Sequence, residues 1–371
     1  MLQISHKING KTILVTGGTG SFGNAVVSRL LKDFRPKKVI VMSRDEKKQF
    51  DMRNKYPHDY LHFIIGDVRD RRAVDRAMKG VDLVFHASAL KQVPTGEFFP
   101  MELIQTNILG SHNVIDSAIQ HDIEKIVILS TDKAVAPINV MGMTKALMEK
   151  VMVAASRENT GRTVLCGTRY GNVLYTRGSV VPFFVEQIKQ GLPLTVTHGK
   201  MTRFMLPLDE SVDLVLYALA NGGNGDIYVR KAPASTIEDI AKAVCEIFGH
   251  KQGIKEMGIR PGEKMHESLV SKEELWRTED HGDYYRIMPE SPKMDLRNYY
   301  FKGEKKLDIP DEGFTSHNTR RLSLKETKKM ISSLEEIKKE LKGFKRTKNE
   351  NRNNGRGGIH RKTSRLGSKK R

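Results

Sequence analysis

Residues 11–23 read KTILVTGGTGSFG and join an apolar run of strand length to a glycine-rich turn and a helical pattern. Gly17 permits a tight turn, Gly20 lets the backbone approach a pyrophosphate, and Gly23 lets helix and strand pack closely. Such a junction points backbone N–H groups and the positive end of a helix at a phosphate. The stretch predicts a dinucleotide site, although a plain strand-to-helix turn also fits it. Further candidate cofactor contacts in this turn are Thr19, Ser21 and Phe22.

The second apolar run, KKVIVM at 37–42, ends where dinucleotide folds bind the adenosine ribose. An acidic residue there would accept from a free 2′-hydroxyl, whereas an arginine matches a 2′-phosphate. Arg44, helped by Ser43 and Lys48, therefore favours NADP over NAD. A solvated, charged start of a helix is the other interpretation of these residues.

Strand-like runs recur at 61–65, 82–86 and 125–129, separated by the helix-length segments 71–79 and 101–120. This alternation predicts an α/β fold with a doubly wound parallel sheet, the Rossmann arrangement, covered by helices on both faces.

Residues after the third and fourth runs are further cofactor candidates. Asp67 could accept from the adenine amino group, and Ala87, Ser88 and Ala89 have small side chains where a dinucleotide would cross the sheet edge. The cofactor set is completed by Val68 and Lys91.

Several motifs resemble a known family. TGGTGSFG, SRDEKK, GDVRD, HASALK and STDK are similar to the extended short-chain dehydrogenases that modify nucleotide sugars. STDKAVAPINVMGMTK, TRYGNVLYTRGSVVP, MTRFM and RPGEKMHE more closely resemble the UDP-N-acetylglucosamine 4,6-dehydratases of bacterial surface-polysaccharide synthesis, especially the C5-inverting capsule type. The similarity runs from about residue 11 to about residue 343 and implies UDP-N-acetylglucosamine as substrate and NADP as cofactor.

Asp132 and Lys133 directly follow the run KIVILS, which places them at the carboxyl end of a strand, where α/β sheets bind ligands. The resemblance implies that Asp132 protonates the departing C6 hydroxyl and that Lys133 removes the C5 proton. Next to a C4 ketone, the C5 proton is acidic enough for an amine whose pKa is lowered by burial and a neighbouring cation. A surface pair that caps the next turn is the alternative.

Lys145 stands four residues after Met141, so a helix would project both from one face. Most short-chain dehydrogenases have Tyr-x-x-x-Lys here, with the tyrosine as general base. Met141 cannot accept the proton of the 4-hydroxyl, whereas Lys145 can still bind the nicotinamide ribose. The resemblance implies that the capsule-type subgroup tolerates methionine at this position. The alternative that this protein is an inactive relative stays open.

The resemblance also implies substrate contacts in the second half. Asn172 and Arg177 are candidates for the diphosphate, and Arg260 with Glu263 for the second phosphate and the uridine ribose. A solvated basic loop would have the same spacing. For Thr202 and Arg203, a role in packing is as consistent with the sequence as a contact with the substrate. The candidate substrate residues nearer the sheet are Lys91, Thr131 and Met141.

Helical periodicity at 179–190, 237–248 and 323–341 predicts a smaller, mostly helical substrate domain. The last segment begins with a capping box, Ser323 and Glu326. We therefore expect an NADP-binding domain at 1–178, a mainly substrate-binding domain at 179–342 with some strands in the Rossmann sheet, and a basic disordered tail at 343–371.

Composition, with 38% hydrophobic and 29% charged residues, is that of a soluble globular protein. The start of the chain lacks an apolar signal region, and no run approaches the roughly 18 apolar residues of a spanning helix. We expect a cytoplasmic homo-oligomer, for which a hexamer is one form, without membrane contact. Cys166 and Cys245 lack metal-ligand spacing, so we expect buried thiols and no metal.

Positive charge is concentrated at the end of the chain. Residues 342–371 hold 12 Lys or Arg against one Glu, a net +11 that leaves +8 of the total +19 for the rest. Such a tail could bind RNA or an anionic membrane nonspecifically, or be an extension without catalytic consequence.

The sequence predicts an NADP-dependent UDP-N-acetylglucosamine 4,6-dehydratase that inverts C5. A nucleotide-sugar 4-epimerase shares the fold but returns hydride to C4, and Asp132-Lys133 argues against it, because epimerisation eliminates no water. A non-enzymatic dinucleotide sensor that binds RNA through its tail is the other class considered.

Overall fold

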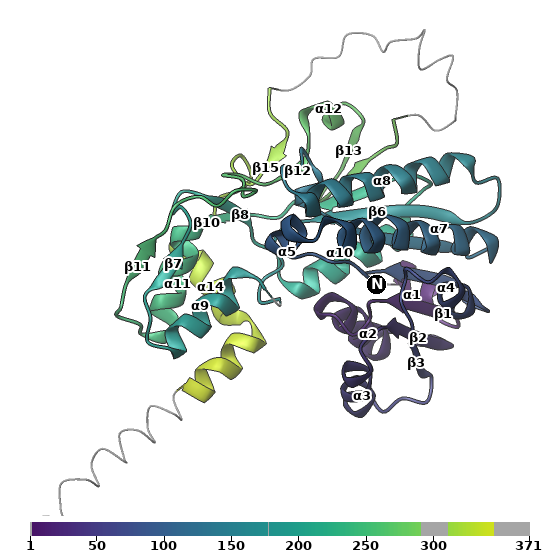
Figure 1. The fold of residues 1–371 in the computed structure, drawn as a ribbon, viewed down its shortest axis with the longest axis horizontal. Coiled ribbons are helices and arrows are strands. Elements are labelled where there is room, and N and C mark those ends of the chain that lie inside the picture. Colours follow the sequence, from purple (N-terminus) through teal and green to yellow (C-terminus); the bar gives the residue numbers. More distant parts are fainter. Residues whose placement is uncertain (1, 177, 291–310, 345–371) are drawn as a thin grey trace, which may run out of the picture.

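The computed structural model describes residues 2–176, 178–290 and 311–344, and within them nine strands form one large sheet (Figure 1). Seven neighbouring strands are parallel, and two at one edge are antiparallel. In spatial order they are β3 (Leu61–Ile65), β2 (Lys38–Ser43), β1 (Thr12–Thr16), β4 (Leu83–His86), β5 (Lys125–Thr131), β6 (Val164–Tyr170), β9 (Ile227–Arg230), β14 (Tyr284–Ile287) and β13 (Thr278–His281).

Helices cover both faces of this sheet. One apolar core lies between the sheet and α4 (Arg71–Met78), α7 (Gly110–Gln120) and α8 (Val140–Glu158). The other lies between the opposite face and α1 (Leu2–Ile8), α2 (Ser21–Asp33), α3 (Glu46–Lys55) and α10 (Leu208–Asn221). Because parallel strands are buried on both sides, they read as continuous apolar runs. The predicted doubly wound fold is confirmed.

A smaller unit with its own apolar core is built from α9 (Val180–Lys189), α11 (Ile237–Phe248), α14 (Leu324–Ser333) and a further helix at 335–344 (Figure 1). Short strand pairs surround this core: β7 (Leu194–Val196) with β11 (Ile254–Glu256), and β8 (Thr202–Phe204) with β10 (Ala234–Thr236). A third pair, β12 (Ser268–Val270) with β15 (Phe314–Thr315), lies near α12 (Lys272–Leu275) and belongs to the first core.

Two predicted helices differ in the structure. The segment 101–120 is divided into α6 (Pro100–Leu103), a π-helix at Ile104–Leu109 and α7, with the short α5 (Val93–Phe98) before them. Buried Asn107 lies in the π-helix, where its amide exchanges hydrogen bonds with the backbone of Leu90 and donates to Thr144. These tertiary bonds favour the wider turn.

The predicted helix 323–341 begins with the expected capping box at Ser323 and Glu326. It breaks at Leu334, whose backbone is extended (φ −66°, ψ 130°), and helix resumes at residues 335–344. Leu334 packs against the core of the smaller unit, and no local breaker announces the change of direction.

The two cysteines are both free thiols. Cys166 is fully buried, but Cys245 is only partly buried, so the expectation of two buried thiols holds for Cys166 alone. The predicted tail beyond residue 344 lies outside the described residues. In the described ranges, no helix has both the length and the apolar character needed to cross a bilayer.

Candidate active site

The glycine turn after β1 brings three backbones close together. Gly17 has a left-handed φ of +66°, and a Cβ there would lie 2.8 Å from the Ser88 nitrogen. A Cβ on Gly23 would lie 2.5 Å from the Gly17 oxygen, so side chains are excluded at both positions. Gly20 precedes α2 and provides no side-chain cap, which leaves the first turn of the helix suited to an anion. Thr19 is half-buried and Ser21 exposed in this turn.

The turn lies where the order of the strands reverses, between β1 and β4. Such a switch point is where open α/β sheets bind ligands. Ala87, Ser88 and Ala89 follow β4 and reach the same place, as the short distance from Gly17 to Ser88 shows. Phe22, at the start of α2, stacks on Tyr170 with ring centroids 5.8 Å apart.

The candidates for the adenosine end lie after β2 and β3. Arg44 is half exposed, and its Nη1 lies 3.3 Å from the Asp67 carboxylate. Although partial burial opposes it, Arg69 and Arg44 together hold the pKa of Asp67 below its ordinary value. Ser43 is buried at the end of β2, and Val68 packs into the core, so a ligand could meet Val68 only through its backbone. The Lys48 ammonium pairs with Asp45 at 2.6 Å.

Asp132 and Lys133 form a tight turn at the carboxyl end of β5. Asp132 is 1% exposed, and the Thr131 hydroxyl donates to its Oδ1 at 2.8 Å. Lys133 Nζ lies 3.1 Å from Asp132 Oδ1 and 3.4 Å from Glu267 Oε1. The interpretation as a surface cap is therefore wrong, because the acid is buried.

The pKa values of this cluster correct one expectation. Burial lowers the pKa of Lys133, but Asp132 and Glu267 outweigh burial and leave that pKa raised, not lowered as the sequence suggested. A cation, Arg203, also faces Lys133, yet its effect is smaller than that of the two carboxylates. The pKa of Asp132 is raised by burial and by the nearby charge of Glu267, against the opposing effect of Lys133.

Glu267 was missed by the sequence analysis. It is 3% exposed, and its backbone N–H donates to the Ser316 hydroxyl at 2.9 Å. Within the described part of the chain, Glu267 Oε2 and Asp132 Oδ2 are buried oxygens without a hydrogen-bond partner. The signal that could have identified Glu267 was its position at the end of the RPGEKMHE motif, which also contains Arg260 and Glu263.

Lys145 and Met141 are both buried on α8, as the four-residue spacing predicted. Lys145 Nζ donates to the Leu129 carbonyl at 2.8 Å, next to the end of β5. Burial lowers the pKa of Lys145 to about 8, although the charge of Glu149 opposes this. Lys145 can therefore lose or hold a proton near neutral pH.

The other candidate substrate residues come from separate loops. Loss of hydration and the charge of Lys133 lower the pKa of Lys91, so Lys91 lies near the cluster. Asn172 has a buried side-chain oxygen without a partner among the described residues. Arg260 is half exposed, with Nη1 3.7 Å from Glu263. Arg177 lies outside the described residues.

The MTRFM motif serves two purposes. Thr202 is 2% exposed, and its hydroxyl forms hydrogen bonds with the His266 ring and the Ser316 hydroxyl. Thr202 therefore has a structural role. Arg203 Nε lies 3.8 Å from Glu267 Oε1, so Arg203 contributes charge to the cluster. No group of three or more His, Cys, Asp or Glu suited to a metal ion occurs in the described ranges.

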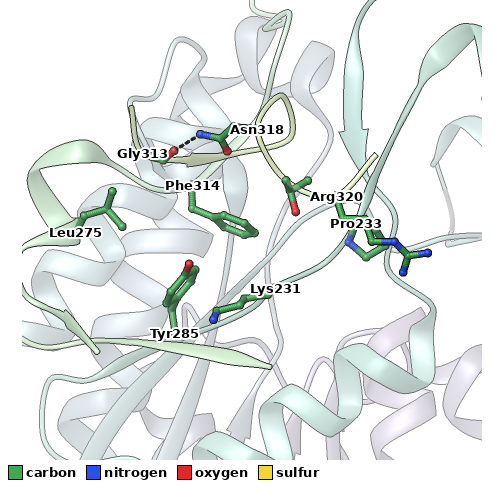
Figure 2. A pocket seen from close by; sticks show the side chains of 9 residues that line it. Lys231, Pro233, Leu275, Tyr285, Gly313, Phe314, Asn318 and Arg320 are labelled. Carbon is green, nitrogen blue, oxygen red and sulfur yellow. Dashed lines mark hydrogen bonds between the residues drawn. The ribbon is translucent and has the colours of Figure 1, made fainter. Parts of the chain in front are cut away.

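A cavity of about 550 Å³ lies apart from these residues (Figure 2). Tyr285 and Phe314 pack edge to face in it, and the Lys231 ammonium lies 4.3 Å from the Tyr285 ring centre. None of the cavity's lining residues is a candidate site residue.

Comparison with known proteins identifies the family. A family model described as polysaccharide biosynthesis protein matches residues 13–289, and its C-terminal counterpart matches residues 294–338. The chain belongs to the polysaccharide biosynthesis protein family. The resemblance seen in the motifs is thus confirmed at the level of the family, while the particular reaction stays a prediction.

Relatives within and around this family have different names. A protein of Rickettsia prowazekii (strain Madrid E) named UDP-glucose 4-epimerase is 55% identical over 90% of this chain and 98% of its own length. The X-ray structure of Pen from Bacillus thuringiensis is 31% identical, with a TM-score of 0.80 over 88% of this chain and 99% of that one. The dTDP-glucose 4,6-dehydratase DesIV from Streptomyces venezuelae, at 23% identity and a TM-score of 0.63, covers 68% of this chain and 86% of its own, and shares the fold.

Proposed function

We propose that this protein is a nicotinamide-dependent 4,6-dehydratase of UDP-N-acetylglucosamine that inverts C5. The observation that carries the proposal is the buried Asp132–Lys133 pair at the carboxyl end of β5. Eliminating water from a sugar requires a proton donor and a base on neighbouring carbons, and an acid beside an amine supplies both. An epimerase eliminates no water and therefore does not need this acid–base pair.

The residues around the sheet edge fit a dinucleotide. Gly17 and Ser88 approach each other without side chains between them, and α2 begins without a side-chain cap. The chemistry that NADP supplies when bound is acceptance of a hydride from C4 of the sugar and its return to C6. Arg44 supports the 2′-phosphorylated cofactor, and buried Lys145 is suited to hold the nicotinamide ribose.

The elimination assigns a role to each member of the pair. Neutral Lys133 takes the proton from C5 of the 4-keto sugar, and the C5–H electrons form the C5–C6 double bond. The C6–O bond breaks, and its oxygen leaves as water with the proton of Asp132. With the hydride returned to C6, protonation of C5 on the opposite face would then give UDP-2-acetamido-2,6-dideoxy-β-L-arabino-hex-4-ulose, a precursor for capsule or O-antigen. Because the pKa of Lys133 is raised, little of its amine is neutral near neutral pH, so the rate should rise with pH until Asp132 loses its proton.

A nucleotide-sugar 4-epimerase is the second candidate, favoured by the name of the Rickettsia relative. Incubation of the pure protein with UDP-N-acetylglucosamine, and separately with UDP-glucose, distinguishes the two by mass spectrometry. The dehydratase removes about 18 mass units, one water, from the first substrate. A product of unchanged mass that separates as the C4 epimer would instead establish an epimerase.

Arg44→Ala should weaken NADP binding by roughly ten- to a hundredfold and change NAD binding little, because losing a charged phosphate contact costs about 1.5–3 kcal/mol. Calorimetry with both cofactors measures the difference. Lys47→Ala is the matched control, since its side chain is 83% exposed and pairs with Asp51. Equal losses for NADP and NAD would show that Arg44 does not bind the 2′-phosphate.

Met141→Tyr should raise the rate of water loss by less than about tenfold, or about 1.4 kcal/mol in the barrier. The wild-type protein already contains the acid and the amine, and Met141 is 4% exposed in a packed site that a larger ring would crowd. Met143→Tyr is the control, because Met143 is 51% exposed on the same helix. A wild-type protein that stays inert until tyrosine is installed would identify Met141 as the mark of a degenerate site.

We further propose that residues 1–178 mainly bind the cofactor, that residues 179–342 mainly bind the nucleotide sugar, and that the protein works as a cytoplasmic homo-oligomer. The helices and separate core of the smaller unit support the division of roles. The basic residues beyond 344 are proposed to have no catalytic role.

A further inference from the structure

The Lys133 ammonium lies between two buried carboxylates. Its Nζ is 3.1 Å from Asp132 Oδ1 and 3.4 Å from Glu267 Oε1, and the two acidic side chains are 1% and 4% exposed. Two carboxylates held this close with little water do not ionise independently, and the first charge opposes the second. The surroundings therefore decide which of them carries the charge.

The surroundings favour a charge on Glu267. Arg203 Nε lies 3.8 Å from Glu267 Oε1, and the charge of Lys264, whose Nζ donates to the Val135 carbonyl at 2.6 Å, also acts on this carboxylate. Burial opposes ionisation, but Lys133, Arg203 and Lys264 together leave the pKa of Glu267 below its ordinary value. The neighbouring His266 ring is bonded to the Thr202 hydroxyl instead.

Asp132 has fewer cations close to it. Among the described residues, Lys133 is the cation within salt-bridge distance of Asp132, and the Thr131 hydroxyl donates to the same Oδ1. Glu267, in contrast, has both Lys133 and Arg203 within that distance. The charge of Lys264 acts on both carboxylates. Asp132 Oδ2 is buried and without a hydrogen-bond partner in the described part of the chain, and so is Glu267 Oε2. Because an unpartnered oxygen in a dry site opposes a charge on both groups alike, the carboxylate with fewer cations beside it, Asp132, is better placed to carry the proton.

We propose that Glu267 holds the negative charge of this cluster, so that Asp132 keeps its proton and is ready to release the C6 hydroxyl as water. Glu267 is thus a positioning residue that acts through its two neighbours, and this role rests on the proposed dehydratase activity. Removing its charge lets Asp132 become the anion beside Lys133. The acid is then lost, although every atom of the catalytic pair is still present.

The test compares the full-length wild type with Glu267→Gln and Glu267→Asp. Near neutral pH, kcat for water loss from UDP-N-acetylglucosamine should fall by about a hundredfold in Glu267→Gln, with KM little changed. Both limbs of the pH profile should move to lower pH, because the anion raises the pKa of Asp132 and of Lys133. Glu267→Asp should restore the wild-type midpoints, and Glu256→Gln, whose carboxylate is 54% exposed, is the control.

A lower kcat with unmoved limbs would overturn the inference, because it would indicate a structural role. Infrared spectra of the ligand-free protein give a second measurement that needs no activity. The wild type should show a buried carboxylic acid band near neutral pH that disappears in Asp132→Asn and in Glu267→Gln. A wild type without this band overturns the inference even if Glu267→Gln does not fold. A wild type that has the band but removes no water overturns the proposed function alone.

Discussion

Lys133→Ala is expected to slow water loss by about a thousandfold, close to 4 kcal/mol in the barrier, while NADP binding stays nearly unchanged. Alanine removes the amine that we propose takes the C5 proton, and it leaves the glycine turn after β1 intact. In the wild type, solvent deuterium should enter C5 of the product. Rates come from mass spectrometry of the reaction, and cofactor binding comes from calorimetry.

A suitable control is Lys150→Ala, since Lys150 lies on α8 with 63% of its side chain exposed and pairs with Glu290. That variant should keep the wild-type rate. Full dehydratase activity in Lys133→Ala would remove Lys133 from the reaction and leave the assignment of the base wrong.

Arg169→Met should cost about 3–5 kcal/mol of the free energy of unfolding, because it leaves buried Glu149 without its cation and removes the closer of the two arginines that pair with partly buried Glu274, the other being Arg277 at 3.1 Å. The Arg169 guanidinium, 5% exposed, pairs with Glu149 at 2.6 Å and Glu274 at 2.7 Å. These bonds join β6 to α8 and to α12. Methionine keeps much of the volume, so the loss measures the missing charge. Urea unfolding of both proteins gives the difference.

The pH dependence separates charge from packing. Burial raises the pKa of Glu274, but Arg169 outweighs burial and lowers it below the ordinary 4.5, so this stabilisation is complete above that pH and is lost as pH falls through the folded-state pKa. The difference between wild type and Arg169→Met should therefore shrink in acid. Arg230→Met is the control, because the Arg230–Glu210 pair is 21% and 36% exposed and should cost about 1 kcal/mol or less. Equal losses in the two variants would contradict the argument.

The sequence by itself determined the features that neighbouring residues encode. The glycine turn, the apolar runs of the parallel strands and the Asp132–Lys133 position after β5 are local patterns, and the structure has each of them where the pattern predicts. Such patterns can be predicted from the sequence because φ/ψ preferences and the burial of a strand depend on a few neighbouring residues. The capping box at Ser323 is a signal of the same kind.

Only the tertiary structure decided the breaks in two helices and the direction of the Lys133 pKa shift. The π-helix depends on bonds from Asn107 to Leu90 and Thr144, and the break at Leu334 depends on packing into the smaller core. The pKa of Lys133 is raised by Asp132, its neighbour in sequence, and by Glu267, a residue far along the chain that folding brings within 3.4 Å. A sequence shows which groups can carry charge, but the sign of a pKa shift follows from which groups lie within a few ångströms of each other, and that distance is set by the fold.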